Sequence, residues 1–157
     1  MKLPVYLRLL AASETTLAES YRTIAEAHGD EPDVHHLCLT LAEQCDEHRK
    51  KLDGIIERFG SGAESEGDDD EPDRLHADGV GEARSGPLGL LRDLQDLYLL
   101  ASLADITWTM VKQAAQALED HDLLDVVAAC EHEIAVQLSW LSTRMKQAAP
   151  QALVAVP

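Results

Sequence analysis

Carboxylates, thiols and an imidazole recur along this 157-residue chain at positions where the surrounding pattern is apolar. These are the groups that bind zinc or iron in proteins. A polar group on an apolar helix face is costly unless it finds a partner, so several of them at one level predict a site in the interior. The candidates are Glu14, Cys45, His48, Asp105, Cys130 and Glu133.

Four long segments must position these residues. Apolar residues recur in each at intervals of three and four, the spacing that turns one face of a helix toward a core. No segment alternates with the period of two that is typical of a strand. The sequence therefore predicts an all-α chain with helices at about residues 3–28, 32–59, 88–119 and 122–149.

The connections between these segments differ greatly in length. Only a few residues, around Gly29 and around Asp120, join the first helix to the second and the third to the fourth. Short connections place consecutive helices side by side and antiparallel. Residues 60–86 are numerous enough to cross the whole bundle when extended. We expect a single domain, residues 1–157, in which two antiparallel hairpins are joined by a long crossover.

Distance from the turn gives the height of each candidate in its hairpin. Glu14 lies 15 residues before Gly29, and His48 lies 19 residues after it. Asp105 lies 15 residues before the second turn at Asp120, and Cys130 lies ten residues after it. Residues at similar distances from a turn lie at similar heights, so the candidates should gather near the middle of the bundle.

This arrangement resembles the ferritin-like superfamily, which includes the rubrerythrins and bacterioferritins. Its members are four-helix bundles with a long crossover, and their di-iron pattern is Glu, Glu-x-x-His, an acid and Glu-x-x-His on successive helices. Glu14 and Asp105 match the two single-acid positions, and His48 matches the His of the first motif. The resemblance implies a metal site at the bundle centre.

Three positions depart from the family pattern. Cys45 and Cys130 stand where each motif begins with Glu, and Glu133 stands where the second motif ends with His. A thiolate replaces a bridging carboxylate poorly on hard ferric iron, which disfavours di-iron oxygen chemistry. The remaining donors suit one metal ion, zinc or iron, with His48 and the two cysteines as principal ligands. Redox or thiol chemistry at the bundle centre is one alternative for such a site, and the motifs assign no substrate.

A structural interpretation accounts for the same residues. Free cysteines are commonly buried as small apolar side chains. His48 would then hydrogen-bond Glu14, and Asp105 would bond Trp108 or a tyrosine. On this interpretation the bundle holds no metal and serves as an assembly or partner-binding module. Three histidines at the hairpin end are expected to be solvated: His28, His35 and His36.

Composition limits the class of protein. The formal net charge of −16 argues against binding to nucleic acid or to anionic membranes. Much of this acidity lies in residues 60–86, which we expect to form a flexible, solvated spacer. No segment is long and apolar enough to span a membrane. Three cysteines without a short spacing favour a reducing cytoplasm.

The third and fourth helices carry more apolar residues than one core-facing stripe needs. The additional residues are Leu90, Leu97, Leu99, Leu100, Leu103, Val126, Val136 and Trp140. A wide apolar surface needs a cover. Two-fold symmetry is the commonest among soluble homo-oligomers, so we expect a homodimer or another homo-oligomer, with a different protein partner as the alternative.

Overall fold

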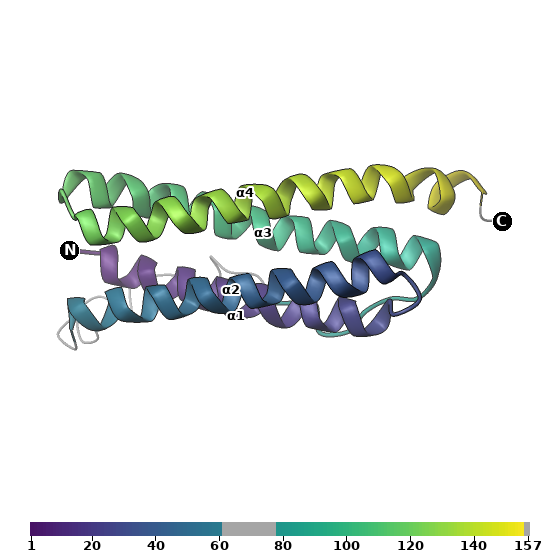
Figure 1. Ribbon diagram of the computed structural model, residues 1–157, viewed down its shortest axis with the longest axis horizontal. Coiled ribbons are helices and arrows are strands. Elements are labelled where there is room, and N and C mark those ends of the chain that lie inside the picture. The colour runs from purple at the N-terminus through teal and green to yellow at the C-terminus, as the bar shows by residue number, and fades with distance from the viewer. Residues whose placement is uncertain (61–77, 156–157) are drawn as a thin grey trace.

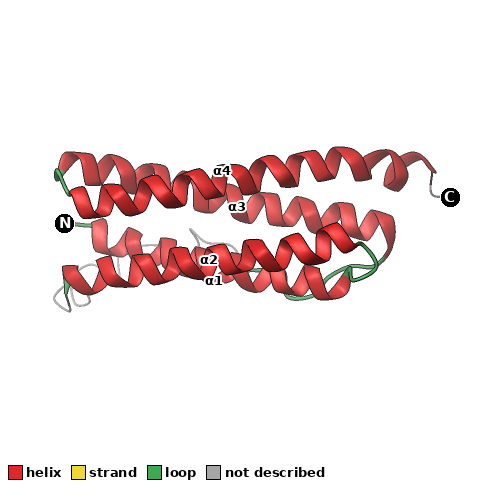
Figure 2. Ribbon diagram, viewed as in Figure 1, coloured by secondary structure: helices red, strands yellow, loops and turns green. Residues whose placement is uncertain are grey.

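The computed structural model describes residues 1–60 and 78–155, and within these ranges it contains helices and no strand. The four long helices are α1 (Leu3–Ala27), α2 (Pro32–Phe59), α3 (Gly86–Ala117) and α4 (His121–Pro150), and the π-helical turn η4 (Gln151–Ala155) continues α4. Figure 2 shows how little of the described chain lies outside helices. The predicted all-helical class and four-helix bundle are confirmed.

The helix ends follow local chemistry. A proline stands in the first turn of α1, α2 and α3, where no backbone N–H is needed for the helix. Gly60 ends α2 with a φ of 80°, a backbone conformation that glycine adopts readily. The Asp120 carboxylate accepts the backbone N–H of Leu123 at 3.1 Å and so caps α4. Arg58 also binds Asp120, which ties the end of α2 to the start of α4.

The helices pack in pairs around one core. Residues 28–31 turn the chain so that α2 returns alongside α1, and residues 118–120 do the same for α3 and α4 (Figure 1). α1 also packs on α3, and α2 packs on α4. The largest fully buried apolar side chains include Leu7, Leu10, Leu17, Ile24, Leu52, Leu94, Trp108, Leu123, Ile134 and Leu141. All four helices therefore contribute to a single interior.

The described end of the crossover, residues 78–85, lies against α1. The backbone N–H of Val80 donates to Ser20 Oγ at 3.0 Å. A Cβ on Gly79 would stand 2.7 Å from Ser20 Oγ and 3.0 Å from a methyl of Thr16, so the chain comes this close because residue 79 is glycine. The prediction of a flexible acidic spacer falls mainly on residues outside the described ranges.

His28 is buried, and the expectation that it would be solvated was wrong. Its Nε2 donates to Asp93 Oδ2 at 2.8 Å, and the Asp93 side chain is completely buried. The Arg84 backbone N–H donates to the same oxygen at 2.9 Å, and the Arg84 guanidinium donates to Oδ1 at 2.9 Å. This His28–Asp93–Arg84 cluster joins the end of α1, the crossover and α3.

Part of the apolar surplus on α3 belongs to the core. Leu90, Leu97 and Leu100 are buried, because α3 packs on both α1 and α4. The assignment of these three leucines to an outer surface was therefore wrong, whereas Leu99 and Val136 are exposed. Among the described residues, no helix has both the length and the apolar character needed to cross a membrane.

Candidate functional site

Glu14 is the centre of a polar cluster inside the bundle. Its side chain lies on α1 between Leu10 and Leu17, all three fully buried, because the intervals of four and three residues put them on one helix face. Glu14 Oε1 accepts the indole N–H of Trp108 on α3 at 2.8 Å. The same oxygen lies 3.2 Å from His48 Nδ1 on α2. The hydrogen bond between His48 and Glu14, expected on the structural interpretation, is present.

His48 stands between two carboxylates. Its Nδ1 bonds Glu14, and its Nε2 lies 3.2 Å from Oε1 of Glu133 on α4. The His48 ring is fully buried, whereas the Glu133 side chain is 35% exposed. Burial by itself lowers the pKa of His48, but hydrogen bonds and charge from Glu14 and Glu133 outweigh burial and raise that pKa above its ordinary value. The central cluster, defined as Glu14, His48, Trp108 and Glu133, therefore favours a protonated imidazole.

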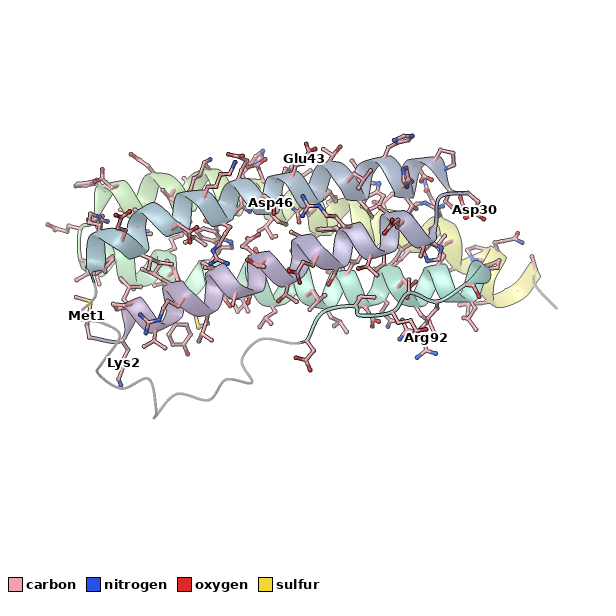
Figure 3. All side chains as sticks on the ribbon, turned by 90° about the horizontal axis from the view of Figure 1, so that it is seen from below. Met1, Lys2, Asp30, Glu43, Asp46 and Arg92 are labelled. Atoms are coloured by element: carbon pink, nitrogen blue, oxygen red, sulfur yellow. The ribbon has the colours of Figure 1, made fainter. Side chains whose placement is uncertain are left out.

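Polar residues of α2 lie in the interior or on the surface according to the side of the helix that they occupy. Glu43 and Asp46 lie on the outer side of α2, where they are labelled in Figure 3. Cys45 and His48, three residues apart, are both fully buried on the opposite side. Residues that are adjacent in the sequence can therefore lie one in solvent and one in the core, because successive residues of a helix are rotated by about 100° around its axis.

The two cysteines of the predicted site are free and buried beside the central cluster. Burial raises the pKa of Cys45, and both the negative charge of Glu14 and a close contact between its carboxylate and the Cys45 thiol raise that pKa further. Burial raises the pKa of Cys130 to about 12, and the nearby carboxylates of Glu14 and Glu133 add to that rise. Thiols with such pKa values stay protonated at neutral pH, so neither cysteine is an activated nucleophile.

Sequence reasoning missed Gln137 as an interior polar residue. Its Oε1 accepts the hydroxyl of Tyr21 at 3.0 Å, and its Nε2 donates to Gln44 Oε1 at 3.2 Å. Cys45 Sγ lies 3.9 Å from the same amide. A signal was present, because Gln137 follows Ile134 by three residues, but Leu138 fits the same pattern as a core residue.

Asp105 lies apart from the central cluster. Its side chain is half-buried, and within the described part of the chain its carboxylate makes no hydrogen bond or ion pair. Burial raises the pKa of Asp105, and the charge of Glu131 on α4 raises it further. Trp108, expected as a partner of Asp105, instead donates to Glu14. The α3 contribution to the cluster is therefore an indole N–H and not a carboxylate.

The structure brings Glu14, Cys45, His48, Cys130 and Glu133 into one region without a ready-made ligand set. Over residues 1–60 and 78–155, no group of three or more His, Cys, Asp or Glu side chains is placed to hold a metal ion. The two nitrogens of His48 face carboxylates on opposite edges of the ring, so these three side chains share no common centre. One acceptor is left over, since Glu14 Oε2 is buried and has no hydrogen-bond partner among the described residues.

Comparisons with family models, with curated proteins and with solved structures find no match for this chain. The residues of the central cluster are therefore the basis on which a function can be inferred.

Proposed function

We propose that this chain is a ferritin-like helical bundle that binds one divalent metal ion, zinc or iron, beside Glu14. The observation that carries the proposal is the buried, unpartnered Oε2 of Glu14. Leaving a buried acceptor without a partner costs about 1–3 kcal/mol, and more for a charged group. A cation next to this oxygen would remove that cost.

The side chains around Glu14 have the chemistry of ligands for such an ion. Cys45 and Cys130 would supply sulfur after losing their protons to the metal, since a coordinating thiol is deprotonated. His48 would lose one proton to solvent and exchange one of its two carboxylate hydrogen bonds for a bond to the ion, and the other hydrogen bond would fix the ring orientation. A di-iron centre fits poorly, because cysteines replace the bridging carboxylates. Asp105 is not needed.

Metal analysis tests this proposal. Protein purified without chelators should carry about one zinc or iron per chain by inductively coupled plasma mass spectrometry. Its cobalt-substituted form should show thiolate-to-cobalt absorption in the near ultraviolet. Glu14→Gln should reduce metal content several-fold, whereas Asp105→Asn, outside the central cluster, should retain it. A wild-type chain that binds neither zinc, iron nor cobalt would overturn the proposal.

A second candidate is a bundle without metal that acts as an assembly or partner-binding module. The observation that favours it is that both ring nitrogens of His48 are already hydrogen-bonded to carboxylates. The two candidates predict different behaviour of His48→Ala in thermal unfolding. Loss of a ligand lowers the melting temperature more in metal-loaded protein than in chelator-treated protein, whereas loss of a hydrogen-bonded core residue lowers both equally.

The ferritin-like architecture and the cytoplasmic location belong to the same proposal. Two short connections, residues 28–31 and 118–120, support two antiparallel hairpins, with residues 60–86 as the crossover. Three free cysteines support a reducing compartment. Distance measurements between labels at the helix ends test the first of these statements, and cell fractionation tests the second.

A further inference from the structure

An apolar surface is open to solvent where α1 and α3 meet. On α3, Leu99 is 63% exposed, Ile106 is 53% exposed and Met110 is 44% exposed. These side chains share one side of the helix because they are seven and four residues apart. We call this surface the α1/α3 face and define it by Tyr6, Leu9, Leu99, Leu103, Ile106 and Met110.

The α1/α3 face is grooved. A hollow of about 160 Å³ lies between the two helices, with Tyr6 and Leu9 on one side and Ile106 on the other. A second hollow, of about 340 Å³, adjoins it, because Tyr6 and Met110 line both. The lining of the two hollows is mostly apolar, so side chains of a partner helix could be buried there.

The charge of this face differs from that of the rest of the chain. The chain carries a formal net charge of −16, so two copies repel each other at most orientations. Between Leu97 and Val111 the only Asp, Glu, Lys or Arg is Asp105. Asp105 lies on the α4 side, where the charge of Glu131 acts on it. The exposed stripe of α3 therefore brings no charged side chain of its own against a second copy.

The spacing on α3 suits an identical partner. Leu99, Leu103, Ile106 and Met110 are separated by four, three and four residues, the intervals of a helix–helix seam. These intervals are the same in both directions along the helix. A two-fold axis between Leu103 and Ile106 would thus place each residue opposite an apolar residue, Leu99 facing Met110 of the partner subunit. The next position outward, Gln95, would face an alanine, so no like charges oppose each other there.

We propose that the chain forms a two-fold symmetric dimer through the α1/α3 face, with the two α3 helices antiparallel across the axis. Tyr6 and Leu9 flank the seam and cover its edge. The interface contains no residue of the central cluster. Dimer formation is therefore independent of metal binding, and either proposal can fail without the other.

Mass measurement in solution tests the dimer. Sedimentation equilibrium at micromolar concentration should give the wild type twice its chain mass of 17.2 kDa. Ile106→Glu should give the chain mass. Val136→Glu is the matched control, because Val136 on α4 is also 53% exposed but lies outside the α1/α3 face, and this variant should remain dimeric. Unchanged helical circular dichroism would show that both variants fold. A monomeric wild type, or a dimeric Ile106→Glu, would overturn the proposal.

Cross-linking tests the register. Leu99→Cys and Met110→Cys variants, each made in the native background, are mixed and treated with a short bismaleimide. The native cysteines are all buried and should not react. The mixture should give cross-linked dimers, whereas each variant alone should give few. In either variant alone the two introduced thiols would lie about 16 Å apart along the seam, eleven residues at about 1.5 Å each. Equal cross-linking of the single variants would overturn the antiparallel seam.

Discussion

Two buried histidines, His28 and His48, each pair with a carboxylate, and the two carboxylates differ in how completely they are satisfied. At the end of α1, both oxygens of Asp93 accept hydrogen bonds, from His28 and from Arg84. At the bundle centre, Glu14 accepts two bonds on one oxygen and none on the other among the described residues. A satisfied buried pair needs nothing more, whereas an unsatisfied one has capacity for a ligand.

The same comparison separates structure from function. The His28–Asp93–Arg84 cluster fastens three parts of the chain that are distant in sequence, and this is sufficient reason for its burial. The central cluster joins helices that already pack through apolar side chains, so fastening the helices is not by itself a sufficient reason for burying its polar groups. Their presence in the core is better explained by a bound ion or by a need to specify one packing arrangement.

Among these variants, Asp93→Ala should lower the free energy of unfolding the most. The change leaves the ring N–H of His28 and the backbone N–H of Arg84 without their acceptor, and each buried donor left unpaired typically costs about 1–3 kcal/mol. Urea unfolding of the two proteins measures the loss. Asp96→Ala is the control, because Asp96 binds the same Arg84 from a position that is 39% exposed, where an ion pair contributes little to stability. Equal losses for the two variants would show that the Asp93 cluster is not a fastening point.

Isosteric amides sharpen the comparison between the two carboxylates. In Asp93→Asn, the new NH₂ group must face a donor from His28 or Arg84, which costs about 1–3 kcal/mol. In Glu14→Gln, the NH₂ group can occupy the place of the unpartnered Oε2, so the loss should be smaller. Urea unfolding of chelator-treated protein measures both. If Glu14→Gln costs as much as Asp93→Asn, then Oε2 of Glu14 has a partner and the contrast fails.

The contribution of protonated His48 to stability should be visible in the pH dependence of the unfolding free energy. Its pKa in the folded protein is raised above the value of about 6.5 for an unfolded chain. The resulting stabilisation is therefore complete below the unfolded pKa and is lost as pH rises through the folded pKa. The difference in unfolding free energy between wild type and His48→Gln should be largest below about pH 6.5 and should shrink as the pH rises from there through the folded pKa.

Asp105→Asn should change the free energy of unfolding the least. The Asp105 side chain is half-buried, and burial together with the charge of Glu131 raises its pKa, so its charged form gains little from the fold. Removing the charge should change stability by less than about 0.5 kcal/mol, as is usual for surface substitutions away from special contacts. A melting curve compared with that of wild type measures this. A large loss would place Asp105 in the central cluster after all.

The apolar periodicity alone was enough to predict helices and to place Glu14 and His48 in the interior. Both residues stand in register with leucines at intervals of three and four, and this spacing fixes the buried side of a helix before any partner is known. The periodicity could not choose between Gln137 and Leu138, since adjacent residues differ by about 100° and both fit a broad stripe. The packing of α4 against Tyr21 made that choice.

What the sequence by itself determined is therefore the helical class and the core-facing side of each helix, because these depend on local spacing. Partners were decided only by tertiary structure. On α3, Trp108 and not Asp105 hydrogen-bonds Glu14, and at the end of α1 His28 is buried against Asp93. Both outcomes depend on how far each helix is rotated and shifted in the bundle. That rotation is set by close packing of many side chains from all four helices at once, which no single stretch of sequence encodes.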